Sequence, residues 1–194
     1  MFLSLTQGTK MEDYKKRIGE FSEFVKSSFH YLEVDYKYQR SEIVINDPES
    51  SRDIKVTIQY LGKTVGVVVA WFVGEHNIVV GIYELHNGAI PEKVSFYGDS
   101  GFYRAINLNS LCKMISNGDI EPPIPELTPN LKLKEMYRRA DISADILRHN
   151  MGGVIKILAE RLKKYGDRIL IGDISIFPKV QEFHKKIWTL DIER

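Results

Sequence analysis

The stretch that decides the fold is residues 54–85, IKVTIQYLGKTVGVVVAWFVGEHNIVVGIYEL. Residues 54–60 alternate apolar and polar side chains, the two-residue period of a strand with one buried face. Residues 65–73 are apolar on both faces, which favours a central strand, and residues 78–85 form a third extended segment. The turns between them are too short for parallel crossovers. The stretch therefore predicts an antiparallel meander with residues 65–73 at its centre.

Apolar residues alternate with polar ones in a second region: Leu32, Val34, Tyr36, Tyr38, Ile43 and Ile45. Residues 46–51 are dense in turn-forming residues and end that pattern. After a turn at residues 86–88, residues 93–106 add one more extended segment. We therefore expect an α+β fold with an antiparallel sheet of about five or six strands.

An amphipathic helix is predicted ahead of the sheet, from Met11 to about Phe29. Its apolar residues recur at spacings of three and four: Met11, Tyr14, Ile18, Phe21, Val25 and Phe29. A sheet of this kind needs a cover on at least one face. We expect the helix to supply it by packing Phe21 and Val25 against Trp71 of the central strand.

A domain boundary is predicted after a short helix at residues 107–117, which Gly118 is suited to cap. The next segment, residues 119–130, contains four of the seven prolines and cannot form regular structure. We therefore assign an α+β sheet domain to residues 1–118, a Pro-rich connector to 119–130, and a helical region packed on the sheet domain to 131–194.

The helical region is expected to begin after Asn130 and to hold three helices. The first reaches about His149, Gly152-Gly153 breaks the run, and the second ends at Gly166. The apolar residues of the first helix are expected on one face: Leu133, Met136, Tyr137, Ala140, Ala144 and Leu147.

An apolar connector at residues 169–171 is expected between the second and third helices. Ser175 or Asp173 can cap the third helix, which begins near Pro178.

Composition excludes several classes of function. The 194 residues include 27 Lys or Arg and 26 Asp or Glu, so the net charge is +1, which argues against a chain built to neutralise phosphates. The lone cysteine, Cys112, cannot form an intramolecular disulfide and suits a reducing cytoplasm. The start of the chain lacks a basic signal-peptide region, and its longest apolar run is nine residues against the about 20 of a membrane span. We expect a cytoplasmic protein without membrane association.

Three short motifs suggest a function but have a simpler interpretation. Gly98-Asp99-Ser100-Gly101 has the letters found around a serine-protease nucleophile, yet no histidine stands in the matching context, so a polar turn is the simpler interpretation. The glycines at 62 and 66 flank a strand with no helix after it, which excludes a phosphate loop. The residues 122–125, Pro-Pro-Ile-Pro, are better explained as a stiff connector than as a peptide ligand.

The charged and histidine residues form no metal or catalytic pattern. The five histidines lack metal-ligand spacing. Asp141 and Asp145 lie four apart on a predicted helix, where ion pairs with Arg138 and Arg148 are the simpler account. Basic residues of the last helices suggest a weak nucleic-acid patch that acidic residues interrupt: Arg138, Arg139, Arg161, Lys163, Lys164, Arg168, Lys185 and Lys186.

One segment carries a family resemblance. Residues 159–166, AERLKKYG, lead into residues 169–177, ILIGDISIF, and this order resembles the closing segment of small bacterial immunity proteins found beside polymorphic or contact-dependent toxins. The resemblance also covers the general layout of the chain. It implies a non-enzymatic binder that occludes a toxin's active site, and it supplies no functional residues to carry over.

The sequence therefore predicts a bacterial binding protein without catalytic, cofactor-binding or metal-binding residues, whose partner is a protein and by the resemblance a toxin. The contact surface is expected at the turns around residues 47–53 and 75–77, or on the exposed side of the helical tail. Two alternatives stay open: a weak nucleic-acid-binding module that uses the basic helices, and an enzyme whose active site carries no motif. The oligomeric state is not specified by the sequence.

Overall fold

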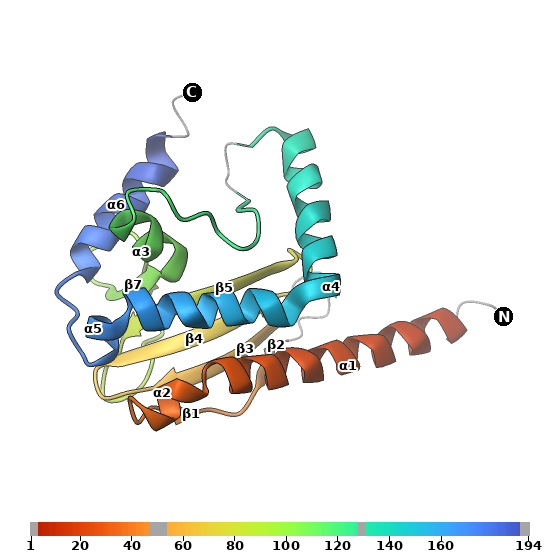
Figure 1. Cartoon of the computed structure of the whole chain (residues 1–194), viewed down its shortest axis with the longest axis horizontal. Coiled ribbons are helices and arrows are strands. Elements are labelled where there is room, and N and C mark those ends of the chain that lie inside the picture. Colours follow the sequence, from red (N-terminus) through yellow and green to blue (C-terminus); the bar gives the residue numbers. More distant parts are fainter. Residues whose placement is uncertain (1–3, 47–53, 128–130, 191–194) are drawn as a thin grey trace.

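The fold is a mixed sheet with helices packed on it (Figure 1). The computed structural model describes residues 4–46, 54–127 and 131–190, and side chains within those ranges from residue 15 to residue 187. The strands are β1 (Gln39–Arg40), β2 (Val44–Asn46), β3 (Lys55–Leu61), β4 (Val65–Phe72), β5 (Asn77–Glu84), β6 (Val94–Ser95) and β7 (Tyr103–Asn107).

The strand order is β1-β3-β4-β5-β7-β6, and β2 also pairs with β3. All pairs are antiparallel except β6 with β7, which are parallel. The predicted meander is confirmed, because β4 lies between β3 and β5 with Val69 opposite Ile58 on one side and Val80 on the other. The predicted α+β class is confirmed as well, with one parallel pair added at the edge.

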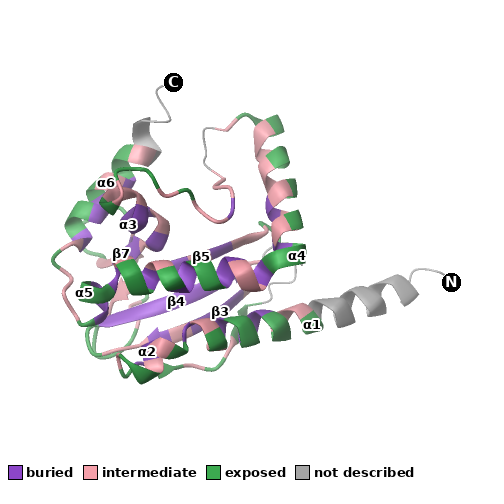
Figure 2. Ribbon diagram, viewed as in Figure 1, coloured by how far each residue is buried: buried purple, intermediate pink, exposed green. Residues whose placement is uncertain are grey.

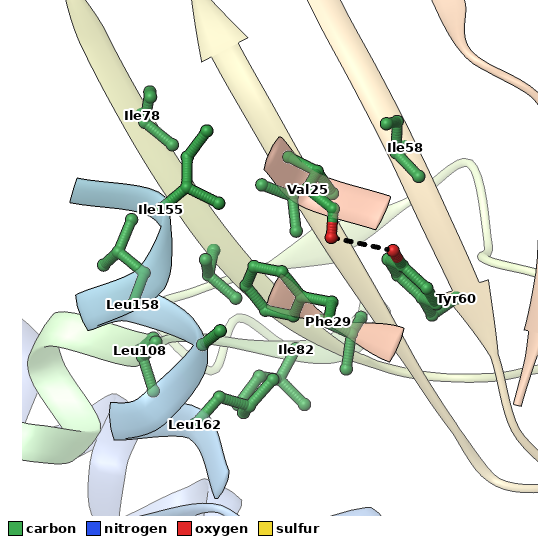
Figure 3. Close-up of a cluster of buried hydrophobic side chains, with 14 of the residues drawn as sticks. Val25, Phe29, Ile58, Tyr60, Ile78, Ile82, Leu108, Ile155, Leu158 and Leu162 are labelled. Carbon is green, nitrogen blue, oxygen red and sulfur yellow. Dashed lines mark hydrogen bonds between the residues drawn. The ribbon is translucent and has the colours of Figure 1, made fainter. Parts of the chain in front are cut away.

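Helix α1 (Ser4–Ser28) covers the first face of the sheet, as predicted. Phe21 and Val25 have no exposed surface, and the ring of Phe21 lies 5.7 Å from the ring of Trp71, centroid to centroid. Figure 3 shows Val25 beside Tyr60, whose hydroxyl donates to the Val25 carbonyl oxygen at 3.4 Å. These contacts place the main core between α1 and β3–β5.

Helix α4 (Leu133–Tyr165) completes this core with its second half. The helix is kinked at Asn150, whose backbone angles are not helical, and its two halves run in different directions (Figure 1). The predicted break therefore occurs, but ahead of the glycines. Gly152 and Gly153 lie inside the second half of the helix. Their lack of a side chain is needed for packing, because a Cβ on Gly152 would come within 2.9 Å of the Phe24 ring and one on Gly153 would meet the side chain of Asn150.

The predicted strand over Leu32–Tyr38 is wrong, because His30–Val34 form the short helix α2 and no residue from 35 to 38 belongs to a strand. The extended segments begin after it, where Gln39–Arg40 and Val44–Asn46 each pair with β3. The alternation misled because its apolar residues do not share a face: Leu32 is buried, whereas Val34 is 51% exposed. The turn predicted at residues 46–51 lies outside the described residues except for Asn46, which ends β2.

Three further helices complete the chain. The predicted short helix is confirmed as α3 (Leu108–Ile115), whose first turn is capped by Asn107, since its Oδ1 accepts from the Asn109 N–H at 2.8 Å. Gly118 follows with φ +92°, and its N–H donates to the carbonyl of Lys113 at 2.8 Å, a C-terminal closure that favours glycine.

The connector predicted at residues 169–171 is largely the short helix α5 (Asp167–Leu170), with Ile169 and Leu170 buried. Helix α6 (Phe177–Leu190) begins near Pro178 as predicted. The cap predicted at Ser175 or Asp173 is wrong, because the helix begins at Phe177 and these two residues bond to each other in the preceding loop: the Ser175 N–H and hydroxyl donate to Asp173 Oδ1 at 3.0 and 2.5 Å.

The Pro-rich segment has no regular secondary structure over residues 119–127, as predicted, and Asn130 lies outside the described residues. Ile124 anchors this segment, since it is only 4% exposed and belongs to the core cluster. In the described part of the chain, no helix is both long and apolar enough to cross a membrane.

Candidate binding site

The Gly98–Gly101 motif lies in a turn, as predicted. Gly98 and Gly101 have φ of +78° and +80°, and the Ser95 hydroxyl donates to Asp99 Oδ2 at 2.6 Å. The N–H groups of Tyr97 and Asp99 in turn donate to Ser95 Oγ at 3.0 and 3.2 Å. These bonds hold the Asp99 carboxylate on Ser95, at the base of the turn.

The histidines lie in different parts of the structure, and the described residues contain no group of three side chains that could hold a metal ion. His86 stacks on Tyr103 with ring centroids 4.9 Å apart. His149 Nδ1 lies 3.3 Å from the Asp145 carboxylate on the exposed face of α4. His184 differs from these two because it is buried, and it belongs to the cleft described below.

The charged helices are locally compensated. Arg138 pairs with Glu135 at 2.7 Å, and the expected pairing with Asp141 is wrong. Arg138 and Arg139 together hold the pKa of Glu135 well below its usual range, at about 2. Three further basic residues each pair with a carboxylate: Lys163 with Asp35, Arg168 with Asp173, and Lys186 with Glu182. The suspected nucleic-acid patch is therefore interrupted by acids in space as well as in sequence.

A cleft of about 420 Å³ opens on the second face of the sheet, opposite the main core. It lies between β4–β5, helices α3 and α6, and the Pro-rich segment. Side chains alternate along β4, so Val67, Val69 and Trp71 enter the main core, while Val68 and Ala70 form the floor of the cleft. Small residues make this floor concave.

Aromatic rings line one side of the cleft. Tyr83 lies over Gly81, where a Cβ would come within 2.7 Å of the Tyr83 ring. Phe96 meets Tyr83 edge to face, with ring centroids 5.7 Å apart. Burial raises the pKa of Tyr83. Glycine at position 81 is therefore what allows the tyrosine ring to lie against the sheet.

A buried hydrogen bond forms the wall opposite. Ser110 Oγ on α3 lies 2.6 Å from His184 Nδ1 on α6, and both residues are buried. The ring of Tyr97 packs against His184 at 5.1 Å. Burial lowers the pKa of His184, which favours the neutral imidazole. The bond joins α3 to α6 through two residues that lie 74 positions apart in the chain.

The remaining polar groups of the cleft include one ion pair and one unsatisfied acceptor. Lys113 Nζ lies 2.6 Å from Glu126 Oε2, and Arg139 donates to the Glu126 carbonyl oxygen at 2.9 Å. Glu126 thus connects the Pro-rich segment to both α3 and α4. Asn109 Oδ1 is buried and has no hydrogen-bond partner among the described residues.

The first half of α4, residues 133–149, is termed the arm. Sequence periodicity places Leu133 and Tyr137 on a packed face, but each is 65% exposed, and that part of the prediction is wrong (Figure 2). Only the base of the arm is buried, at Ser143 and Leu147, and Arg17 Nη2 donates to the Leu147 carbonyl oxygen there at 3.1 Å. The arm therefore extends from the body of the protein with apolar side chains exposed.

Of the two turns that the sequence predicts as a contact surface, the structure describes only the one at residues 75–77. Residues 47–53 lie outside the described residues, whereas Glu75 and Asn77 of the second turn line the cleft. The sequence did not predict the Ser110–His184 pair, because neither residue lies in a recognisable motif and the two are 74 positions apart. Gly81 within a strand was the available signal, since such a glycine often marks a close approach.

No family model, curated protein or solved structure matched the chain.

Proposed function

We propose that this chain is a non-enzymatic binding protein whose partner is another protein, and that the arm is its main contact surface. The observation that carries the proposal is the 65% exposure of both Leu133 and Tyr137, one helical turn apart. Tyrosine is among the residues most often dominant at protein interfaces, and burying a Leu side chain stabilises a complex by roughly 1.5–3 kcal/mol. An unpacked apolar pair on a projecting helix is a ready anchor for such a partner.

The arm is held in place before any partner binds. Glu135 forms ion pairs with Arg138 and Arg139, and Arg139 also donates to the Glu126 carbonyl oxygen. Arg17 holds its base through the Leu147 carbonyl oxygen. A preorganised contact surface loses less conformational entropy on binding, which raises affinity for a given number of anchors.

The immunity-protein resemblance supplies the partner class, a toxin that the chain neutralises by covering its active site. A stoichiometric inhibitor needs a rigid surface with a few anchoring side chains and complementary charges. Leu133 and Tyr137 are the anchors in this proposal, and the charged residues around them determine the orientation of the bound partner. Bacterial origin and a cytoplasmic location belong to the same proposal.

Co-expression with the product of the adjacent gene tests this function. We expect a one-to-one complex that buries about 1,200–2,000 Å² in total. The double variant Leu133→Asp with Tyr137→Asp is expected to abolish the complex without unfolding the chain, since both side chains are exposed. Ile171→Asp is the matched control, because Ile171 is 74% exposed but lies next to α5, away from the arm. Equal binding by the arm variant and the control would contradict the proposal.

A second candidate function, an enzyme at the cleft, is favoured by one observation: Ser110 Oγ lies 2.6 Å from His184 Nδ1. A serine nucleophile needs such a base to take its proton. Binding is preferred over catalysis because Ser110 is only 6% exposed, which leaves little access for a substrate carbonyl. Labelling of Ser110 by a fluorophosphonate probe would support the enzyme instead.

A further inference from the structure

We infer that the cleft is a second binding site and that it takes an uncharged apolar residue within a short peptide segment. The inference rests on the proposed function in one respect, that the partner is a protein. It assigns a different surface from the arm and a defined ligand chemistry: an apolar or aromatic side chain flanked by peptide groups.

The space and the floor of the cleft suit an apolar side chain. Its volume of about 420 Å³ falls within the about 300–1,000 Å³ of ligand sites, and the small side chain of Ala70 adds little bulk to the floor. Tyr83 and Phe96 provide an aromatic wall, against which a ring or a branched aliphatic group gains contact.

The charges of the cleft argue for an uncharged occupant. Among the described residues, four charged side chains line the cleft, and two of them, Lys113 and Glu126, pair with each other. The other two, Lys55 and Glu75, have opposite signs, and Lys55 Nζ lies 5.2 Å from the centre of the Phe72 ring. Because the acidic and basic side chains of the described lining balance each other, the lining offers little compensation for the desolvation of a charged ligand.

The polar lining of the cleft matches peptide groups. Asn109 Oδ1 is a buried acceptor without a partner among the described residues, and leaving such an atom unpaired costs free energy. An N–H group of a bound peptide would satisfy it. Asn77 also lines the cleft, and its amide side chain can both donate to and accept from a peptide bond.

The position of the cleft favours a segment of a larger partner. Lys113, Pro123 and Glu126 line the cleft and also line the groove between the Pro-rich segment and the arm. The two surfaces are therefore adjacent, on either side of the Pro-rich segment. A protein seated on the arm can extend one segment across that segment into the cleft.

The test is an NMR titration of the isolated chain with N-acetyl-L-phenylalaninamide, an uncharged residue with a peptide group on each side. We expect saturable shifts at Gly81, Tyr83, Phe96 and Asn109. N-acetyl-L-aspartate, which is anionic, should bind about tenfold more weakly or not at all. Equal binding of the two probes, or shifts confined to other surfaces, would overturn the inference.

Two variants locate the binding. Ala70→Leu fills the floor, and Asn109→Leu removes the acceptor with little change of volume; each should weaken the uncharged probe by about tenfold. Ile157→Ala is the matched control, since Ile157 is 38% exposed on α4 and does not line the cleft. Should Ala70→Leu fail to fold, Asn109→Leu decides alone, and an unchanged affinity in that variant would refute the site.

The inference and the proposed function can fail separately. Probe binding needs no partner, so a cleft that binds the uncharged probe upholds the inference even where the arm variant leaves the complex intact. If the complex depends on the arm but the cleft does not bind the uncharged probe, the inference is overturned and the proposed function stands.

Discussion

Replacing Trp71 by alanine is the sharpest test of the core. Trp71 lies on the central strand β4, is 2% exposed and points into the face that α1 covers. Its ring meets Phe21 at 5.7 Å, and the guanidinium carbon of Arg17 lies 5.5 Å from its centre. The substitution therefore removes a buried ring from the contact between the sheet and α1.

The expected loss is roughly 3–5 kcal/mol in the free energy of unfolding, the usual cost of truncating a buried aromatic residue. About 0.5–1.5 kcal/mol of that loss comes from the aromatic pair with Phe21, beyond the burial of area. The loss is expected near the upper end of the range, because the surrounding strand is hydrogen-bonded on both sides and cannot collapse into the cavity.

Urea denaturation followed by circular dichroism measures the effect, since this signal does not depend on tryptophan fluorescence. Phe72→Ala is the matched control, because Phe72 is the next residue on β4 but faces the cleft and is only half-buried. It should cost about 1–2 kcal/mol. Equal losses for the two variants, or a loss below about 1.5 kcal/mol for Trp71→Ala, would refute the assignment of faces along β4.

Three further predictions concern the candidate sites. Burial lowers the pKa of His184 from its usual 6.5, so the unfolded chain takes up the proton first as the pH falls. The contribution of His184 to stability should therefore be complete above about pH 6.5 and fall as the pH drops toward the folded-state pKa. Urea titrations at about pH 7.5 and about pH 5.5 measure this difference in stability, which His184→Gln should reduce. Burial raises the pKa of Cys112 to about 11, so iodoacetamide at about pH 8 should modify this thiol only after denaturation, and rapid labelling of the native chain would contradict its burial. Ser100→Ala should leave stability and any activity unchanged, whereas Asp99→Ala should leave activity intact but cost about 1 kcal/mol through the bond to Ser95, as thermal unfolding would show.

The centre of the sheet could be predicted from sequence because β3, β4 and β5, with seven, eight and eight residues, are long enough to show a strand pattern. The apolar run at residues 65–73 allows only a central strand, and β4 is one. The pattern at Leu32–Tyr38 failed because four alternating residues also fit a short helix followed by a loop. There Leu32 and Tyr38 are buried while Val34 is exposed, which no regular strand would produce.

The two candidate surfaces, the arm and the cleft, could not be predicted because each depends on packing between distant segments. The apolar stripe at Leu133 and Tyr137 has helical spacing, but spacing does not reveal whether a neighbour covers it, and in the described structure these two side chains are exposed. The cleft has Ala70 in its floor and the Tyr83 ring, which Gly81 admits against the sheet, at its side. Its polar wall joins α3 to α6, whose sequences give no sign that they meet.

The kink in α4 explains why sequence periodicity could not show which apolar residues of the helical tail are exposed. Periodicity identifies which residues of a helix are apolar, and the kink at Asn150 decides which of them reach the core. Beyond that kink, Ile155, Leu158 and Leu162 are buried, as Figure 3 shows. Before it, only the base of the helix is buried. The change of direction at one residue thus separates a core helix from an exposed one.

The most direct test of stoichiometric protein binding is a titration of the adjacent gene product's toxic activity with the purified chain. The proposal predicts that inhibition grows in proportion to the chain added, is complete at one molar equivalent and does not change with incubation time. The arm variant with Leu133→Asp and Tyr137→Asp should shift this end point or remove inhibition altogether. Progressive loss of toxicity at about a tenth of an equivalent would indicate turnover, and that result, like a complete lack of inhibition, would contradict the proposed function.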